Sequence, residues 1–187
     1  MIHIYCGDGK GKTTAAAGLA ARFAGAGGTV VAARFLKTED SGEAAALRSI
    51  PGITVIPCRK SFGFTWTMTP EEKVEAAEYA RGLFREAERL ALEAAVGAQA
   101  AHSPEEKLPS PPVLLVLDEL AAAMGAGFLG TSEVLGVLDR LEDLAEIVIT
   151  GRNPARELLD RADYITEMRK IRHPYERGIP ARRGIEY

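Results

Sequence analysis

The stretch Gly7-Asp8-Gly9-Lys10-Gly11-Lys12-Thr13-Thr14 predicts the fold of this chain, because it lies between an apolar run and a helix-forming run. Residues 1–6 predict a buried strand and residues 14–24 a helix, so the order is strand, glycine-rich turn, helix. Glycines let the backbone turn sharply and direct successive N–H groups at one point, and the helix N-terminus adds partial positive charge. This order is typical of a loop that binds nucleotide phosphates, and we assign all eight residues to such a site.

The phosphate loop also carries side chains suited to a nucleotide and its metal. Lys12 can bridge phosphate groups, and the Thr13 hydroxyl is a ligand type for Mg²⁺. The spacing is unusual, because the common loop has four residues between its first Gly and its Gly-Lys pair, whereas three separate Gly7 from Gly11. A turn without a ligand would leave Lys10 and Lys12 repelling one another with no anion between them, so we favour nucleotide binding.

The composition indicates one globular domain, residues 1–187. Of the 187 residues, 47% are hydrophobic, which is enough for a full core under a twisted sheet. We find neither a long apolar run nor a signal peptide, so we expect a cytoplasmic protein without a membrane partner. Cys6 and Cys58 are expected to be buried thiols at strand ends, with no disulfide and no catalytic role.

Basic residues are concentrated at the C-terminal end, although the formal net charge is -3. Residues 169–187 contain six lysines and arginines and only two glutamates. Such a basic tail can bind nucleic acid, but six charges are few for that purpose. A triphosphate or a polyacidic small molecule would use them equally well, and we predict no nucleic-acid partner.

Strands and helices alternate along the rest of the chain. We expect strands at residues 29–35, 53–57, 113–117, 145–150 and 163–166, and helices at residues 42–49, 119–124 and 133–141 and over a long stretch after Thr69. This alternation predicts an α/β protein with a doubly wound, mostly parallel sheet of the P-loop NTPase (RecA-like) architecture.

Several local signals predict helix ends and one loop. Thr69 and Glu72 form a capping box before the long helix. The apolar face of that helix is predicted to contain Val74, Ala77, Phe84, Ala87, Leu90 and Ala94. Residues 97–112 have no periodicity and predict a mobile surface loop far from the chemistry.

Two shorter helices have candidate capping residues as well. Thr131 and Ser132 are predicted to cap the helix at residues 133–141. Asn153 is predicted to cap a helix that begins at Pro154.

Asp118 and Glu119 follow the apolar run at residues 113–117. In a P-loop protein this position holds Mg²⁺ opposite the loop threonine, whereas a simpler interpretation is that two carboxylates complement a helix N-terminus. With the phosphate loop present we favour the metal role. The residues alone leave open whether the second carboxylate binds metal or polarises a water molecule.

Two other segments are expected at the ligand-binding edge of the sheet. Thr150-Gly151-Arg152-Asn153 offers an arginine and hydroxyls where a strand ends. Gly63-Phe64-Thr65-Trp66 places two aromatic side chains in a loop, either as ligand contacts or as a hydrophobic plug under the following helix.

Six segments together resemble the P-loop type of ATP:cob(I)alamin adenosyltransferase, over nearly the whole chain. They are the phosphate loop, Arg34-Phe35-Leu36-Lys37, Gly63-Phe64-Thr65-Trp66, Leu117-Asp118-Glu119-Leu120, Thr150-Gly151-Arg152-Asn153 and the tail from Thr166-Glu167-Met168 to Gly184-Ile185-Glu186-Tyr187. The shortened loop and the tail are the most specific, because ordinary P-loop ATPases have neither.

The resemblance implies an enzyme that transfers the 5′-deoxyadenosyl group of ATP to the cobalt(I) of a corrinoid and releases triphosphate. Mg²⁺ would be bound by Thr13 and Glu119, and Lys12 would stabilise the triphosphate. The nucleotide contacts implied outside the loop are Arg34, Lys37, Arg152 and Asn153.

The resemblance also implies a catalytic role for Phe64 and Trp66, which would press on the lower face of the corrin and displace its axial base. Cobalt(II) would then be easier to reduce. The expected partners are the corrinoid, an electron-donating reductase and a second copy of the chain in a homodimer. The chain differs from similar sequences at Arg34, where we expect glutamine, and at residues 60–62, where smaller residues are usual.

Two other functions remain open. One is a P-loop ATPase or kinase, in which Glu119 activates water or Asp8 serves an acceptor. The other is a nucleotide-sensing module whose basic tail docks a partner.

Overall fold

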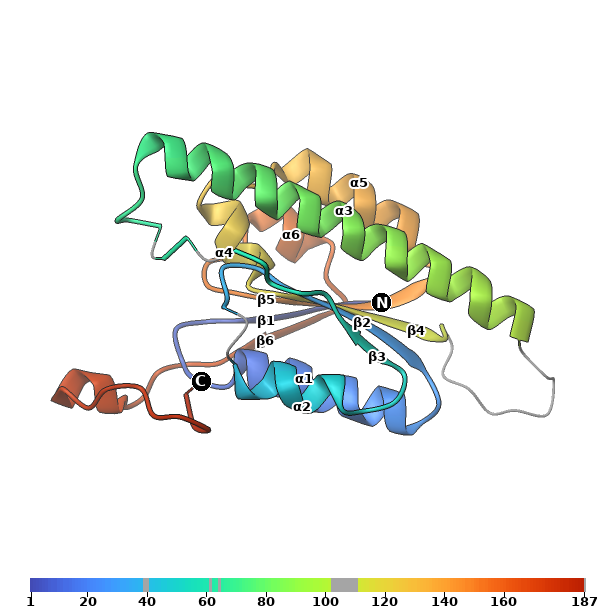
Figure 1. Cartoon of the computed structure of the whole chain (residues 1–187), viewed down its shortest axis with the longest axis horizontal. Helices are drawn as coiled ribbons and strands as arrows, with labels where there is room; N and C mark the ends of the chain where they lie inside the picture. The colour runs from blue at the N-terminus through green and yellow to red at the C-terminus, as the bar shows by residue number, and fades with distance from the viewer. Residues whose placement is uncertain (39–40, 61, 64, 102–110, 187) are drawn as a thin grey trace.

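A computed structural model describes residues 1–38, 41–60, 62–63, 65–101 and 111–186, and its strands form a single parallel sheet (Figure 1). The strands are β1 (Ile2–Cys6), β2 (Thr29–Arg34), β3 (Ile53–Val55), β4 (Val113–Asp118), β5 (Ala145–Thr150) and β6 (Tyr164–Glu167). Their order across the sheet is β3-β2-β4-β5-β1-β6, and every adjacent pair is parallel. The predicted doubly wound α/β fold is confirmed, with each strand found within two residues of its predicted ends.

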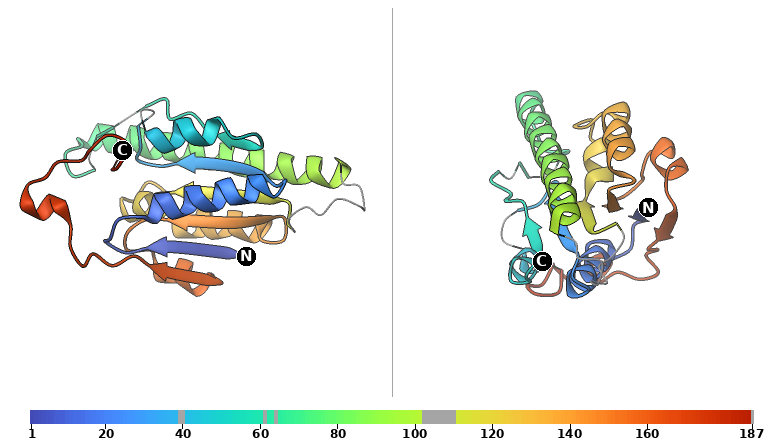
Figure 2. Two further views of the ribbon diagram at one scale, coloured as in Figure 1. Left: turned by 90° about the horizontal axis from the view of Figure 1, so that it is seen from below. Right: turned by 90° about the vertical axis from the view of Figure 1, so that its right-hand side faces the viewer.

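Helices cover both faces of the sheet (Figures 1 and 2). They are α1 (Lys12–Gly25), α2 (Gly42–Arg48), α3 (Pro70–Ala101), α4 (Leu120–Gly125), α5 (Thr131–Leu141), α6 (Arg156–Asp160) and the 3-10 helix η1 (Pro174–Arg177). The helices α1 and α2 lie on one face, and α3, α4, α5 and α6 lie on the other. Within the described ranges, no helix combines the length and the apolarity needed to cross a membrane.

The core is made of two apolar layers, one on each side of the sheet. All six residues of β4 are buried, as expected for a central strand covered on both faces. On the α3 side, Phe35 and Phe84 pack together with ring centroids 6.4 Å apart. On the α1 side, the small residues Ala16 and Ala20 bring the helix close to the strands. Cys6 and Cys58 are buried thiols, as predicted.

The strand order creates a crevice at the carboxyl edge of the sheet. From β1 the chain crosses through α1 to β2, on the far side of β4 and β5. From β5 it crosses through α6 in the opposite direction, to β6. Because the two connections diverge, the loops after β1 and β5 leave space between them, which is where open α/β sheets bind ligands.

The long helix α3 begins as predicted but extends further than predicted. The Thr69 N–H donates to Glu72 Oε2 at 2.8 Å, and the Glu72 N–H donates to Thr69 Oγ1 at 3.2 Å, so the capping box is present. Val74 is 62% exposed, so its place on the apolar face was wrong. Residues 97–101 belong to the helix and not to a loop, because alanines favour continuation. Residues 102–110 of the predicted mobile loop lie outside the described residues.

The two predicted caps of shorter helices were also wrong. Thr131 and Ser132 lie in the first turn of α5, which follows Gly130. Asn153 does not cap α6, which starts only at Arg156. Instead, Asn153 adopts a left-handed conformation with φ 49°, which asparagine tolerates better than most residues.

Candidate active site

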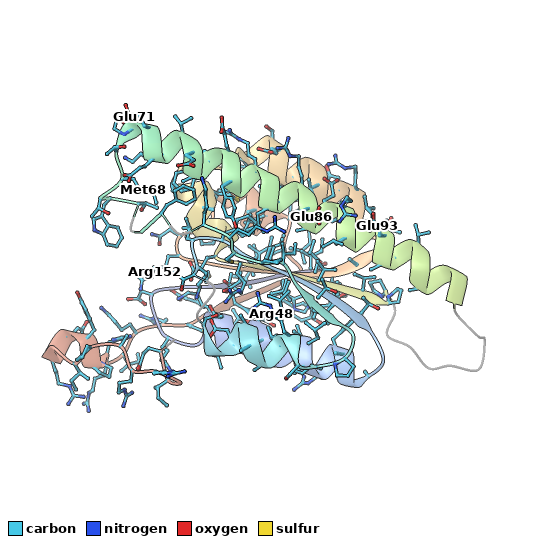
Figure 3. The ribbon with its side chains drawn as sticks, in the orientation of Figure 1. Arg48, Met68, Glu71, Glu86, Glu93 and Arg152 are labelled. Carbon is cyan, nitrogen blue, oxygen red and sulfur yellow. The ribbon has the colours of Figure 1, made fainter. Side chains whose placement is uncertain are left out.

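A cavity of about 840 Å³ lies at the N-terminus of α1, in the crevice at the carboxyl edge of the sheet. Its walls come from the phosphate loop and from three strand-end residues, Lys37, Glu119 and Arg152. The start of α2 and the C-terminal tail complete it. Arg152 is seen at this end of the sheet in Figure 3. The volume is in the range of small-molecule sites in proteins.

Lys12 lies at the centre of the phosphate loop. Its side chain is 7% exposed, and Nζ donates to the carbonyl oxygens of Gly7 and Gly9, both at 2.8 Å. Burial lowers the pKa of the Lys12 ammonium, and the nearby Glu119 carboxylate opposes that effect. The loop therefore folds around its own lysine, which keeps the positive charge beside the cavity.

The first residues of the tail pass directly over the phosphate loop. The Gly9 N–H donates to the Met168 carbonyl at 2.7 Å, and the Lys170 N–H donates to Asp8 Oδ1 at 3.0 Å. This second bond is the main reason why the pKa of the Asp8 carboxyl is lowered. A Cβ atom on Gly9 would lie 2.6 Å from the Met168 carbonyl oxygen, so Gly9 is needed for this close approach as well as for the turn.

Asp118 joins three strand ends beneath the cavity. The carboxylate is 2% exposed, and Oδ1 accepts hydrogen bonds from the Thr13 hydroxyl at 2.9 Å and from the Thr150 hydroxyl at 2.6 Å. The Lys37 ammonium lies 3.7 Å from Oδ2 and 3.4 Å from Thr13 Oγ1. No hydrogen bond to Oδ2 is found within the described part of the chain.

Glu119 follows Asp118 and lines the cavity itself. Its backbone is left-handed, with φ 62°, and its N–H donates to Thr150 Oγ1 at 2.9 Å. Burial, followed by the negative charge of Asp118, raises the pKa of the Glu119 carboxyl. The same threonine hydroxyl therefore orients both acidic residues at the end of β4.

The oxygens near Thr13 fit a magnesium ion by their chemistry. A hydroxyl and carboxylates are hard ligands of the type that Mg²⁺ prefers. Among the residues that the structure describes, no group of three or more His, Cys, Asp and Glu side chains forms a metal cluster. A magnesium site here would therefore need phosphate oxygens to complete its coordination, which is usual for this ion.

Three of the predicted nucleotide contacts, Gly7, Arg34 and Asn153, lie outside the group that lines the cavity. Arg34 is 3% exposed, and its guanidinium donates to the Thr38 carbonyl at 2.9 Å and to the Ser41 hydroxyl. It thus holds the chain between β2 and α2 in place. Asn153 turns the chain after β5. Lys37 and Arg152, by contrast, do face the cavity.

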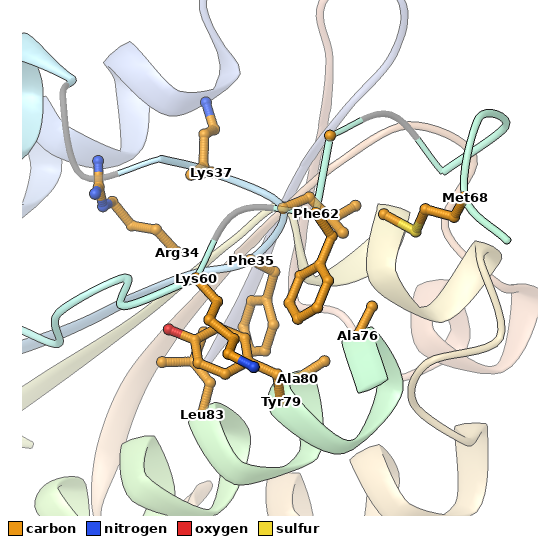
Figure 4. Close-up of a pocket in the computed structure, with 12 residues that line it drawn as sticks. Arg34, Phe35, Lys37, Lys60, Phe62, Met68, Ala76, Tyr79, Ala80 and Leu83 are labelled. Carbon is orange, nitrogen blue, oxygen red and sulfur yellow. The ribbon is translucent and has the colours of Figure 1, made fainter. Parts of the chain in front are cut away.

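The aromatic loop divides its residues between solvent and core. Trp66 is 76% exposed, and Phe64 lies outside the described residues. Phe62 packs against the core, with its ring centroid 5.8 Å from that of Tyr79. Together with Met68 they border a small cavity of about 30 Å³ under the loop (Figure 4). Among the described residues of this loop, Phe62 is thus an aromatic side chain that packs against the core, and we had given it no role.

Comparison with known proteins identifies the family. The family model described as "ATP:corrinoid adenosyltransferase BtuR/CobO/CobP" matches residues 1–187. The chain belongs to this family.

Named relatives are similar over the whole chain. "Corrinoid adenosyltransferase CobA" of Salmonella typhimurium is 31% identical over 188 residues, which cover 100% of this chain and 85% of that protein. "Corrinoid adenosyltransferase" of Pseudomonas aeruginosa is 31% identical over 189 residues, covering 100% and 83% respectively. An uncharacterized protein of Nostoc is 33% identical over 93% of this chain and 45% of its own length. The predicted family and activity class are confirmed, and the ATPase, kinase and sensing alternatives are not favoured.

The structure adds cavity residues that the sequence interpretation of this adenosyltransferase did not include. From the tail these are His173, Ala181, Gly184, Ile185 and Glu186, and from the start of α2 they are Gly42 and Glu43. The distinctive sequence of the tail was the available signal. Nothing in it specified that the tail returns to the phosphate loop, because that path depends on contacts between residues more than 160 positions apart.

The close approach of the tail predicts opposite effects for two glycine substitutions. Gly9→Ala should lower the free energy of unfolding by about 1 to 3 kcal/mol, because the added methyl group must displace the backbone at Met168. Gly18→Ala is the matched control: it lies on the exposed side of α1 with open space around it. That change should raise stability by about 0.5 to 1 kcal/mol. Urea unfolding measures both, and a Gly9→Ala protein as stable as wild type would contradict the packing argument.

Proposed function

We propose that the large cavity binds ATP with its triphosphate on the phosphate loop, and that the adenosyl group is transferred there to cobalt(I) of a corrinoid. In this reaction cobalt supplies the electron pair of the new cobalt–carbon bond, and the bond from C5′ to the triphosphate oxygen breaks. The observation that carries the proposal is a cavity lined by a buried lysine, by a loop at a helix N-terminus and by Thr13, whose hydroxyl donates to Asp118 beneath the cavity. No general base is needed, because the reduced metal is the nucleophile.

The protein must then orient the reactants and stabilise a leaving group that gains negative charge. The first N–H groups of α1 have no partners within the helix and are free to bind phosphate oxygens. To reach the phosphates, the Lys12 ammonium exchanges its bonds to the Gly7 and Gly9 carbonyl oxygens for phosphate oxygens. Arg152 and Lys37 line the same cavity and add positive charge to it.

Thr13 and Glu119 are the proposed magnesium ligands, with Asp118 holding the Thr13 hydroxyl in position. A bound Mg²⁺ would neutralise charge on the triphosphate as it leaves. The Lys37 ammonium lies close to both Thr13 and Asp118. A divalent cation at this position would therefore compete with Lys37 for the same oxygens.

The corrinoid is proposed to bind on the α3 side of the same sheet edge, against residues 60–68. Lys37 lines both the large cavity and the small apolar cavity under this loop, so the two sites meet at the end of β2. This adjacency supports transfer of a group from a nucleotide on one side to a metal on the other. Phe64 and Trp66 are proposed to act on the lower face of the corrin. A reductase that supplies the electron, a homodimer and a cytoplasmic location complete the proposal.

Substitution of Lys12 tests the nucleotide half of this proposal. Lys12→Ala should reduce turnover at saturating ATP at least about 10²-fold, the scale of losing one strong charge-stabilising contact. The assay follows triphosphate release from ATP in the presence of a chemically reduced corrinoid. Lys73→Ala, which removes an exposed charge on α3, serves as the control and should be fully active. Release of ADP and phosphate by the wild type, or an active Lys12→Ala enzyme, would contradict the assignment.

Substitution of Glu119 tests the magnesium site. Glu119→Gln should raise the Mg²⁺ concentration needed for half-maximal rate, because a neutral amide is a weaker ligand than a carboxylate. The urea midpoint should change little or increase, since the substitution removes a half-buried charge next to Asp118. An unchanged magnesium requirement would show that Glu119 is not a ligand.

Substitution of Trp66 tests the corrinoid half. Trp66→Ala should impair the reaction started from cobalt(II) far more than the reaction started from cobalt(I), in which the axial base is already lost. Because Trp66 is 76% exposed, Trp66→Ala should change the free energy of unfolding of the protein by less than about 1 kcal/mol. Phe62→Ala is the matched comparison and should destabilise the fold, since Phe62 packs against the core.

The visible spectrum of enzyme, ATP and cobalt(II) corrinoid gives a direct readout of the Trp66 hypothesis. The wild type should show the four-coordinate species, and Trp66→Ala much less of it. Equal amounts in both proteins would mean that Trp66 does not displace the axial base.

A further inference from the structure

The C-terminal tail forms one wall of the large cavity. The reaction proposed above gives the residues of this wall no role. Its path begins with two bonds to the phosphate loop, from Gly9 N–H to Met168 O and from Lys170 N–H to Asp8 Oδ1. It then returns so that Gly184 and Glu186 face the same cavity. Figures 1 and 2 show the C-terminal end of the tail beside the start of α2. The tail is therefore part of the site and not a free basic arm.

His173 is the residue of this wall that carries a fixed hydrogen-bond donor. It precedes η1, and its Nδ1 accepts a hydrogen bond from the Tyr175 N–H at 3.2 Å. A ring nitrogen that accepts has no proton, so in the neutral imidazole the proton is on Nε2. The backbone of the tail thus sets which nitrogen donates, and His173 is half-buried at the cavity wall.

The cavity that His173 lines contains cations that can bind an acceptor-rich, anionic ligand. The cavity is lined by Lys10, Lys12, Lys37 and Arg152. The carboxylates that line it are Asp8, Glu43, Glu119 and Glu186. Two of these are already engaged, Asp8 by the Lys170 N–H and Glu186 by Arg182 at 3.0 Å. A polyphosphate has the oxygens that the cations and the imidazole N–H would bind.

We propose that His173 donates Nε2–H to a phosphate oxygen of bound ATP, from the tail and across the cavity from the phosphate loop. The inference rests on the proposed function, since it requires ATP in this cavity. It gives the tail a defined role in recognition of the triphosphate. The nucleotide is then held from two sides, by backbone N–H groups and Lys12 of the loop and by a side chain of the tail.

Two substitutions separate this role from a purely structural one. In His173→Asn the amide oxygen can still accept from the Tyr175 N–H, as asparagine does at helix starts, but the distal donor is lost. In His173→Gln the longer side chain keeps an N–H near the position of Nε2, whereas the acceptor near the backbone is lost. If His173 contacts the ligand, His173→Asn should weaken ligand binding. If His173 only caps the backbone, His173→Gln should have the larger effect.

The measurement is equilibrium binding of MgATP and of inorganic triphosphate to the full-length chain by calorimetry, without corrinoid. We expect His173→Asn to weaken both ligands about tenfold or more, the size of one hydrogen bond to a charged group. His173→Gln should stay within about threefold of wild type. Thermal unfolding without ligand should be the same for both variants, because η1 is a short exposed turn.

Four results would overturn the inference. His173→Asn could bind both ligands as wild type does, or Asn and Gln could weaken binding equally, which would indicate a structural cap. A loss for MgATP without a loss for triphosphate would place His173 against the nucleoside. Wild-type protein that binds neither ligand would overturn the proposed function as well, which distinguishes that failure from the other three.

Discussion

The arrangement of the site depends on one buried carboxylate, that of Asp118. An ionised carboxylate with 2% exposure is costly unless polar groups surround it. Here Thr13 at the start of α1, Thr150 at the end of β5 and the Lys37 ammonium after β2 all approach it. Each of these groups comes from a different segment, so satisfying one charge fixes the relative positions of the phosphate loop and three strand ends. The crevice at the carboxyl edge of the sheet is held together by the same interactions that make burial of Asp118 tolerable.

A second constraint is the absence of side chains at Gly7 and Gly9. Sequence reasoning explained these glycines by the turn of the loop and by N–H groups directed at phosphate, yet the Gly9 N–H is bound to the Met168 carbonyl. The tail passes so close that a Cβ atom at either position would meet its backbone. The Gly9 N–H is therefore not available for a phosphate, and the loop also serves as the surface on which the tail packs.

The two faces of the sheet have different chemistry at the same edge. On the α1 side the cavity is polar and surrounded by lysines, arginine and carboxylates, which suits a nucleotide. On the α3 side, Phe35, Phe62 and Tyr79 line a small apolar cavity. Trp66, which follows Phe62 closely in the sequence, is exposed to solvent. Lys37 borders both. The boundary between the polar and the apolar side therefore lies at the carboxyl end of β2.

The sequence by itself determined the strand–loop–helix unit, the alternation of strands and helices, the capping box of Thr69 and Glu72 and the family, because these follow from local periodicity and short motifs. It also placed Lys12, Thr13, Glu119 and Arg152 at one edge of the sheet, since parallel strands end on the same side. Weak local signals failed where longer-range packing or helix continuation prevailed, at Val74, at Asn153 and at residues 97–101. Only the tertiary structure decided that Arg34 bonds to the chain just before α2, that Phe62 packs against the core and that the tail returns to the phosphate loop. The Arg34 bonds depend on how the chain turns after β2, whereas the packing of Phe62 and the path of the tail depend on contacts between segments apart in the sequence, for which sequence spacing carries no physical signal.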